Sequence, residues 1–260
     1  MLKPCMLAHS YEPKRLTHFP VFVSPKLDGL RVRYYKGKFI SRDNKVWNDV
    51  MTSHISKPDF DFIIDGEFYS HGLSLQEINA AMAVKRLEPT HNTPLIRFHV
   101  FDVVQFNTPY ALRYRWLFEH LICENLDNVS IVPQITCSTR QCVDVSTREF
   151  ISQGYEGSMI RHLDMGYENR RTYTLLKNKP FLDGEFPVVG RKEGLGKYAG
   201  MLGALTIQVK EGVRCEVGGG FTDDQRKYYW SAPLPLYIKV KYQCVTDDGN
   251  LRHPTFICEL

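Results

Sequence analysis

The stretch KLDGLR at residues 26–31 places a lysine and a tight turn before a strand-forming run. The run RVRYY at 31–35, a turn at Lys36 and Gly37, and a second run at 38–41 predict a β-hairpin with Lys26 at its mouth. Taken alone, such a lysine is more often a surface residue than a chemical group. Motifs further along the chain decide between the two interpretations.

Four more short motifs follow in order: DGEF at 65–68, FD at 101–102, EGSMIR at 156–161 and LKNK at 176–179. Each falls on or beside a run rich in β-branched and aromatic residues, which favours strands. The predicted strands are 60–68, 96–104, 129–135, 157–162 and 173–177. The five motifs together carry a signal that none of them carries alone.

In this order, the motifs resemble those of the covalent nucleotidyltransferases, and specifically of ATP-dependent DNA ligases. They match motifs I (KxDGxR), III (DGE), IIIa (FD), IV (EG) and V (KxK) of that family and cover almost the whole chain. The resemblance implies an α+β fold class: an adenylation domain of antiparallel sheets with helices, followed by a small all-β OB-fold domain. Short bacterial and phage DNA ligases are the most similar type.

The pattern along the chain agrees with two domains, at 1–180 and 181–260, with a linker and hinge at 180–184. In the first, helices are predicted over 110–123 and after the capping-box pairs Ser74/Glu77 and Ser146/Glu149. In the second, a glycine turn at 218–220, a helix after Thr222 and strands at 236–245 and 255–258 are typical of an OB barrel.

Nucleotidyl transfer explains why a lysine stands among cations. A lysine has an unperturbed pKa of about 10.4, so a lysine nucleophile has to lose its proton before it attacks the α-phosphate of ATP. Neighbouring cations such as Arg31, Lys177, Lys179 and a bound Mg²⁺ disfavour the ammonium form and also neutralise the triphosphate. We therefore predict that Lys26 is the catalytic nucleophile and carries AMP.

The resemblance implies further roles around the nucleotide. Glu67 contacts the ribose or a metal, and Phe101 stacks on adenine. The predicted metal ligands for Mg²⁺, or Mn²⁺ in its place, are Asp28, Glu67 and Glu156. The predicted contacts to nucleotide phosphates are Arg31, Lys177, Lys179 and Arg252, the last in a motif VI-like segment.

The predicted DNA contacts are basic residues in both domains. Arg42 matches motif Ia and is expected to hold DNA or its 5′-phosphate. Arg191 and Lys192 precede the glycine-rich stretch at 194–203, and Lys197 lies within it; the stretch resembles the entry to the OB domain of short ligases. That stretch lacks GxxxxGK[ST], so it is not a P-loop. A solvated loop without DNA contacts remains an equal alternative.

Plainer roles compete for several of these residues. A strand aromatic such as Phe101 is more often part of the core, and aspartates such as Asp28 or Asp65 often cap turns. The alternative for Arg161 is that its side chain only faces solvent. Taken singly, Glu156 and Lys177 are more often members of exposed salt bridges.

Composition sets loose bounds. The 260 residues carry 33 Lys and Arg against 29 Asp and Glu, so the net charge of +4 does not by itself indicate nucleic acid. Seven cysteines without a CxxC pair argue against a disulfide framework and a zinc site. No leader-like or membrane-spanning segment stands out, so we expect no membrane partner and a monomer in the cytoplasm, or in the host-cell cytoplasm if the protein is viral.

The predicted function is sealing of nicks in double-stranded DNA through a lysyl-AMP and an adenylated DNA. An RNA ligase or an RNA-capping nucleotidyltransferase shares much of the motif set, but Arg252-His253-Pro254 and the glycine-rich OB entry favour the DNA enzyme. A non-catalytic OB-containing nucleic-acid binder is the alternative from another class. The presence of Lys26, Glu67 and Lys179 argues against it.

Overall fold

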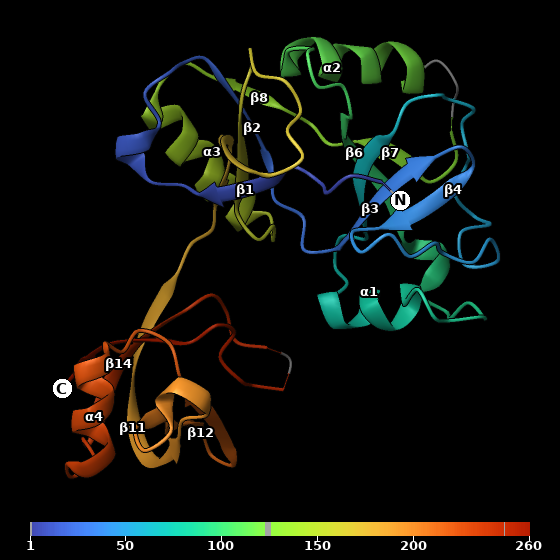
Figure 1. The fold of residues 1–260 in the computed structure, drawn as a ribbon. Helices are drawn as coiled ribbons and strands as arrows, with labels where there is room; N and C mark the ends of the chain where they lie inside the picture. Colours follow the sequence, from blue (N-terminus) through green and yellow to red (C-terminus); the bar gives the residue numbers. More distant parts are fainter. Residues whose placement is uncertain (1, 123–125, 247) are drawn as a thin grey trace. The chain divides into compact units, whose positions relative to one another are not determined.

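The chain forms two compact units in a computed structural model, Met1–Lys179 and Pro180–Leu260 (Figure 1). The structure describes residues 2–122, 126–246 and 248–260. The first unit contains two five-stranded sheets with helices, and the second is built on one five-stranded sheet with a single α-helix among its described residues. The α+β class is confirmed.

One sheet of the first unit has the order β4-β3-β5-β6-β7. Its strands are β3 (Leu30–Tyr35), β4 (Lys38–Ser41), β5 (Ile64–Tyr69), β6 (Arg97–Val103) and β7 (Val129–Ile131). Strands β3 and β4 form the predicted hairpin, and Lys36 and Gly37 take the positive φ angles that its tight turn needs. The largest buried cluster of the unit packs on this sheet and includes residues of α1 (Leu75–Met82).

The other sheet of the first unit has the order β1-β10-β9-β2-β8. Its strands are β1 (Leu7–Ser10), β2 (Val21–Pro25), β8 (Ile135–Cys137), β9 (Ser158–His162) and β10 (Arg171–Asn178). Helix α3 (Arg140–Ser152) covers it and contributes Val143 and Phe150 to a smaller core. Helix α2 (Tyr110–Leu117) lies against β6, and short helical turns occur at Pro13–Arg15, Thr93–Leu95 and Phe118–Ile122 (Figure 1).

The helix predictions are correct for α1 and need correction for α3. Ser74 and Glu77 form both hydrogen bonds of the capping box in front of α1. Helix α3, however, begins after Thr139, whose hydroxyl accepts a hydrogen bond from the Cys142 N–H, so Ser146 lies inside the helix. The prediction failed because Ser146 and Glu149 have the spacing of a capping box although both lie inside the helix, where Ser146 is buried.

Two strand predictions also change. The run 129–135 contains β7 over 129–131 and only the first residue of β8, and these two strands belong to different sheets. The run 60–68 begins too early, because β5 starts only at Ile64. The predicted helix 110–123 ends within the described residues at Ile122, and its last position, Cys123, lies outside them.

The second unit has the sheet order β13-β12-β11-β14-β15. Its elements are β11 (Leu182–Glu193), a 3₁₀ turn (Gly196–Tyr198), β12 (Leu202–Lys210), β13 (Val213–Val217), α4 (Asp223–Ser231), β14 (Tyr237–Tyr242) and β15 (Thr255–Glu259). Residues 182–184, predicted as part of a linker, instead pair with β14. Backbone pairing with β14 therefore extends β11 into the predicted hinge.

Cys137 and Cys142 form a disulfide, which the cysteine pattern did not predict. It links the end of β8 to the first turn of α3 and does not amount to a framework. Disulfides persist mainly in oxidising compartments, so the expected location in the cytoplasm does not predict this bond. Among the described residues, no helix has the length and apolar character that crossing a bilayer requires.

Candidate active site

The Lys26 loop passes from one sheet of the first unit to the other. Strand β2 ends at Pro25 and β3 begins at Leu30, so residues 26–29 join the two sheets. Gly29 is required here, because a Cβ at this position would lie 2.2 Å from the Phe68 carbonyl oxygen. The KxDG turn therefore places its lysine between the sheets and packs its glycine against β5.

Backbone hydrogen bonds fix Lys26 to the segment that precedes β9. The Lys26 N–H donates to the Gly157 carbonyl at 2.9 Å, and the Glu156 N–H donates to the Lys26 carbonyl at 3.1 Å. Gly157 has a φ of 144° and a Cβ there would meet the Asn178 carbonyl at 2.2 Å, which explains the glycine of EG. Backbone hydrogen bonds thus connect motif I, at Lys26, to motif IV, at Glu156 and Gly157.

Glu156 bridges two of the predicted lysines. Its carboxylate forms ion pairs with the Lys26 and Lys179 ammonium groups, one through each oxygen. All three side chains are largely buried, between 14% and 19% exposed, so the pairs are poorly screened by solvent. Lys26 Nζ also donates to the Leu27 carbonyl at 3.2 Å.

A cavity of about 220 Å³ opens beside Lys26 and is lined by residues of both sheets of the first unit. Its lining contains six of the predicted site residues: Lys26, Arg31, Arg42, Glu67, Phe101 and Lys177. Glu156 and Lys179 reach it only through their ion pairs around Lys26. Sequence reasoning missed several other lining residues, among them Met6, Met159, Arg161 and Arg171.

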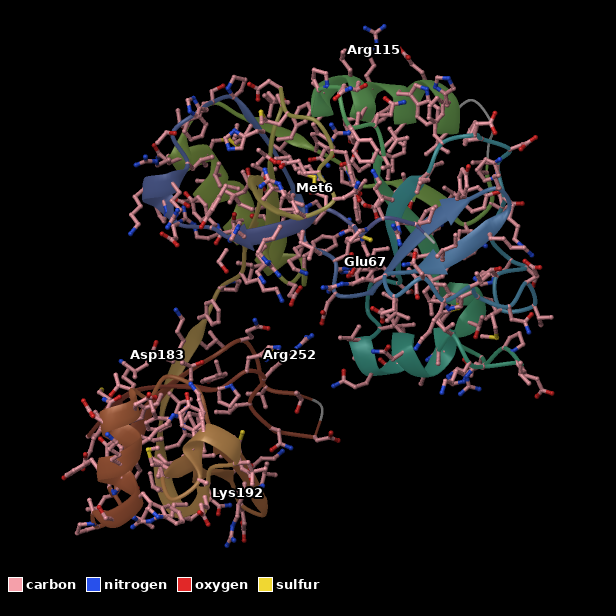
Figure 2. The ribbon with its side chains drawn as sticks, in the orientation of Figure 1. Met6, Glu67, Arg115, Asp183, Lys192 and Arg252 are labelled. Carbon is pink, nitrogen blue, oxygen red and sulfur yellow. A yellow bond between two sulfur atoms is a disulfide. The ribbon has the colours of Figure 1, made fainter. Side chains whose placement is uncertain are left out.

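Glu67 stands opposite Arg31 in the β3–β5 pairing (labelled in Figure 2). One carboxylate oxygen accepts a hydrogen bond from the Gly29 N–H at 2.9 Å. Burial raises the pKa of Glu67 above its usual value, although the cations Lys26 and Arg31 and the Gly29 N–H act in the opposite direction. A buried carboxylate with one oxygen in use can accept a further hydrogen bond from a ligand hydroxyl.

Phe101 is both core and cavity wall, so the two interpretations of this residue do not exclude each other. Its side chain is 8% exposed, belongs to the main core cluster and lines the cavity. The guanidinium carbons of Arg31 and Arg161 lie 4.6 and 5.2 Å from its ring centroid. Two cation–π contacts therefore hold the ring in place.

Buried aspartates hold both arginines that lie beside Phe101. Arg31 forms a bidentate pair with Asp65, at 2.6 and 2.5 Å, and Asp65 also accepts from the Tyr167 hydroxyl at 2.6 Å. Asp65 is fully buried, so its role is larger than capping a turn. Bidentate geometry fixes the guanidinium plane, which a lysine at position 31 could not reproduce.

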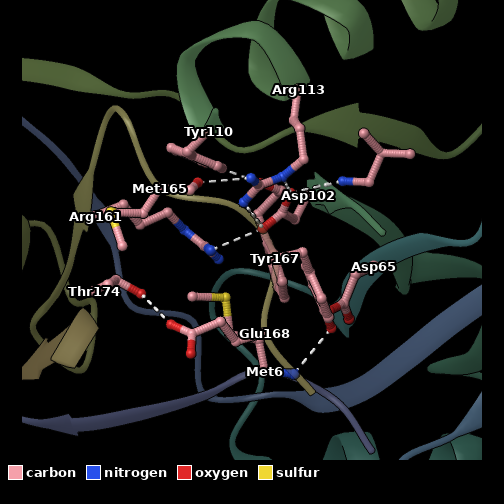
Figure 3. A network of polar contacts seen from close by, with 12 residues as sticks. Met6, Asp65, Asp102, Tyr110, Arg113, Arg161, Met165, Tyr167, Glu168 and Thr174 are labelled. Carbon is pink, nitrogen blue, oxygen red and sulfur yellow. Dashed lines mark hydrogen bonds and ion pairs between the residues drawn. The ribbon is translucent and has the colours of Figure 1, made fainter. Parts of the chain in front are cut away.

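Asp102 of the FD motif binds two arginines at once (Figure 3). Arg113 contacts both of its oxygens, at 2.7 and 3.1 Å, and Arg161 contacts Oδ2 at 3.0 Å. The alternative of a solvent-facing Arg161 is wrong, since this residue is 4% exposed. The sequence did contain a signal for this contact: Asp102 of the FD motif lies in a buried strand, so its charge has to be neutralised by a cation.

The predicted metal ligands do not form a cluster. Among the residues that the structure describes, no group of three His, Cys, Asp or Glu side chains is arranged to hold an ion. Glu156 is engaged by two lysines and Glu67 by a backbone N–H, while Asp28 does not line the cavity. Asp28, Glu67 and Glu156 are therefore not a preassembled triad of ligands.

The predicted DNA-contacting residues have different environments. Arg42 is exposed and lines both the cavity beside Lys26 and a second one of about 660 Å³, which Lys45 and Lys85 also line. In the second unit, Lys192 pairs with Glu216 at 3.0 Å, and the ammonium of Lys197 lies 4.4 Å from the centroid of the Tyr198 ring (Figure 2 labels Lys192). Both lysines are exposed.

Arg191 has a structural role that the sequence did not reveal. Its guanidinium donates to the carbonyls of Tyr229, Trp230 and Ala232 at 2.7, 2.6 and 2.8 Å, and so caps the carboxyl end of α4. Arg252, labelled in Figure 2, lies between β14 and β15, where its N–H donates to the Cys244 carbonyl at 2.9 Å. Its predicted contact with nucleotide phosphates stays a prediction.

Both units match models of known protein families. Residues 5–179 match the ATP dependent DNA ligase domain, and residues 193–259 match the DNA ligase OB-like domain. A DNA ligase of Haemophilus influenzae is 25% identical over 252 residues, which is 96% of this chain and 90% of that protein. A DNA ligase of African swine fever virus is 31% identical over 152 residues, 55% of this chain and 34% of the viral protein.

Solved structures agree with this placement. A structure described as "DNA binding with a minimal scaffold: Structure-function analysis of Lig E DNA ligases" has a TM-score of 0.86 at 25% identity, with 100% of both chains covered. The Chlorella virus DNA ligase-adenylate shares the fold, with a TM-score of 0.57 at 23% identity over 100% of this chain and 99% of that one. The chain belongs to the family of ATP-dependent DNA ligases.

Proposed function

We propose that the protein seals 3′-hydroxyl/5′-phosphate nicks in double-stranded DNA and carries AMP on Lys26 during the reaction. The observation that carries this proposal is the position of Lys26, at the edge of a cavity that also presents Glu67, Phe101 and Lys177. A nucleophile, an acceptor for the sugar, a flat aromatic wall and a phosphate-binding cation are thus gathered around one space. This is the set of groups that nucleotidyl transfer requires.

In the first step, the Lys26 amine attacks the α-phosphorus of ATP, a phosphorus–nitrogen bond forms, and the bond to pyrophosphate breaks. The ammonium has to release a proton before this attack. Glu156 contacts the ammonium directly, so it is the nearest base that can receive the proton. Lys177 and Lys179 then offset the negative charge on the phosphates.

The cavity orients the nucleoside. Phe101 is the proposed stacking surface for adenine, and Glu67 the proposed acceptor for a ribose hydroxyl. Both side chains are fixed before any ligand arrives, Phe101 by two guanidinium contacts and Glu67 by the Gly29 N–H. Such preorganisation lowers the entropic cost of binding in a reactive geometry.

Family membership implies a divalent metal, and Mg²⁺ is the proposed ion. Mg²⁺ is usually held by one or two carboxylates together with substrate phosphates and water, so a site without a three-ligand protein cluster is compatible with it. The bound ion would offset phosphate charge. Glu156 is the proposed protein ligand once it has passed the proton of Lys26 to solvent, since Lys26 loses its positive charge when it becomes a phosphoramidate.

In the second step, the nick's 5′-phosphate oxygen attacks the AMP phosphorus and the bond to Lys26 breaks. In the third, the 3′-hydroxyl attacks the adenylated 5′-phosphate and AMP leaves. Arg42 is the proposed contact for the DNA phosphate, because it is exposed at the cavity that holds Lys26. The protein acts as a monomer in this proposal.

The test uses two matched nicked substrates, one a DNA duplex and the other an RNA duplex of equal sequence. Wild-type protein with ATP and Mg²⁺ should seal the DNA, and Lys26→Ala should seal neither. Supplying a DNA that already carries AMP on its 5′-phosphate should restore sealing to Lys26→Ala, since only the third step is then needed. Sealing of RNA alone would overturn the proposal in favour of an RNA ligase.

A further inference from the structure

Three polar side chains from α3, β9 and β10 meet next to the EG and KxK motifs. Thr147 comes from α3, Ser158 begins β9 and Asn178 ends β10. Thr147 Oγ1 lies 2.7 Å from Ser158 Oγ, and the Asn178 side-chain amide donates to Thr147 Oγ1 at 3.2 Å. None of the three lines the cavity beside Lys26, so their contacts are with one another rather than with a bound nucleotide.

The Thr147 hydroxyl uses its full hydrogen-bonding capacity. It donates its hydrogen to the Val143 carbonyl, one helical turn earlier, at 2.7 Å. The two acceptor positions of the oxygen then take the Ser158 hydroxyl and the Asn178 amide. Thr147 and Ser158 are 5% and 0% exposed, so water does not replace either partner. Loss of the Thr147 hydroxyl would therefore leave buried donors unpaired.

Ser158 lies where motifs I and IV meet. It follows Gly157 directly, and its Cα pairs with Pro25 on one side of β9 and with Asn178 on the other. Pro25 precedes Lys26 in the chain. The network therefore connects α3 to the strand that fixes the nucleophile.

Asn178 separates the two lysines of the KxK motif. Successive side chains of a strand point to opposite faces, so an Asn178 bound to α3 leaves Lys177 and Lys179 on the other face. That face is the reactive one, because Lys177 lines the cavity and Lys179 pairs with Glu156. A slip of β10 by one residue would exchange the faces and turn both lysines toward α3.

We propose that Thr147 is a positioning residue, which holds Asn178 so that Lys177 and Lys179 face the nucleotide phosphates. This rests on the proposed function, because it takes the adenylylation of Lys26 as the reaction. Thr147 acts only through β9 and β10, and it belongs to none of the five motifs. A polar contact from α3 thus sets the register at the reactive end of β10.

The experiment measures single-turnover labelling of the full chain by ATP and Mg²⁺ in Thr147→Val and Thr147→Ser. Valine keeps the shape of threonine without its hydroxyl, so the maximal labelling rate should fall by about tenfold or more. The ATP concentration at half the maximal rate should stay within about threefold of wild type, since Phe101 and Glu67 lie on the other sheet of the first unit. Serine restores the hydroxyl and should restore the rate.

The matched control removes a buried hydroxyl of the same helix that has a different neighbour. Ser146 lies 3.7 Å from the sulfur of Cys137 in β8 and contacts neither β9 nor β10 through its hydroxyl. Ser146→Ala should therefore label at the wild-type rate, whatever stability it loses. Unfolding midpoints of all variants, with labelling carried out well below them, separate lost stability from lost positioning.

A second variant tests the other end of the contact. Asn178→Ala removes the amide at a half-buried strand end and should label as slowly as Thr147→Val, with no further loss when the two are combined. A wild-type maximal rate in folded Thr147→Val, or in Asn178→Ala if the valine variant does not fold, would overturn the proposal, as would a serine variant as slow as valine. Labelling of the wild type but not of Lys26→Ala tests the proposed function separately.

Discussion

The arginines that hold Phe101 and Asp102 in the first unit are bound differently from Arg191 and Arg226 in the second. In the first unit, Arg113 and Arg161 share the carboxylate of Asp102, and a second aspartate holds Arg31. In the second unit, Arg191 and Arg226 bind backbone carbonyls. The first arrangement neutralises charge inside the protein, whereas the second leaves a cation that stabilises a helix end or a loop.

The difference separates the roles of basic residues that look alike in the sequence. The carboxylate-paired Arg31 and Arg161 line the cavity and contact the Phe101 ring. Carbonyl-bound arginines fasten α4 and the β11–β12 loop, so their guanidiniums are already occupied. The proposed cations for DNA phosphates are then exposed ones, such as Arg42 and Lys197. Four changes test this division, from the largest expected effect to the smallest.

Removing the shared carboxylate should have the largest effect. Asp102→Ala leaves Arg113 and Arg161 buried without a counter-charge, and the free energy of unfolding of the first unit should fall by about 3–5 kcal/mol. Denaturant unfolding followed by circular dichroism measures this loss. The matched control Glu216→Ala breaks an exposed pair with Lys192 and should leave the unfolding midpoint unchanged. Equal effects of the two changes would contradict the division.

His99 extends the comparison to a basic residue that is buried without charge. Burial, aided by the nearby Arg97, lowers the pKa of His99 from 6.5 to about 4, and its Nδ1 lies 3.0 Å from the Ser130 hydroxyl. Between these values the unfolded chain binds a proton that the native protein does not. Stability is therefore full above the unfolded pKa and falls, by at most about 3 kcal/mol, as the pH drops toward 4.

His99→Gln should flatten this part of the acid dependence, since glutamine does not titrate. Unfolding midpoints at a series of pH values between neutral and acid give the comparison with the wild type. An identical acid slope in both proteins would show that another group is responsible.

Arg191→Ala tests the carbonyl-bound arginines. The loss of three hydrogen bonds at the end of α4 should destabilise the second unit by about 2 kcal/mol. Fluorescence of Trp230, whose own carbonyl is one of the acceptors, can be followed in a Trp47→Phe, Trp116→Phe background. A variant with wild-type stability and weakened DNA binding would instead restore Arg191 as a DNA contact.

Lys192→Ala should have the smallest effect on folding, because the lysine is exposed and only paired with Glu216. If it contacts DNA phosphate, the slope of log affinity against log salt should shrink by about one while stability stays unchanged. Titration of a nicked duplex at several salt concentrations measures the slope. An unchanged slope removes Lys192 from the DNA interface.

The motifs predicted the site well where chemistry and geometry demand the same residues. KxDG and EG need glycines because a Cβ at Gly29 or Gly157 would strike a carbonyl oxygen, so both motifs are visible as local patterns. Lys26, Glu67, Phe101 and Lys177 were then found together at one cavity. The hairpin was equally predictable, since its turn residues are adjacent in the chain.

The failures concern partners that are distant in sequence. Arg161 meets Asp102 across 59 residues, and Arg191 meets the end of α4 across about 40, so no local pattern could indicate either contact. The start of α3 was misplaced because Ser146/Glu149 imitates a capping box inside the helix. Sequence reasoning identified the reactive groups better than the residues that support them.

The most direct test of the central claim is mass spectrometry of the protein after incubation with ATP and Mg²⁺, followed by peptide mapping. We expect one added adenylyl group per chain, on the peptide that contains Lys26, and its loss when nicked DNA is supplied. Lys26→Ala should gain no mass. An adenylyl group on any other residue, or none on the wild type, would contradict the assignment of Lys26 as the nucleophile.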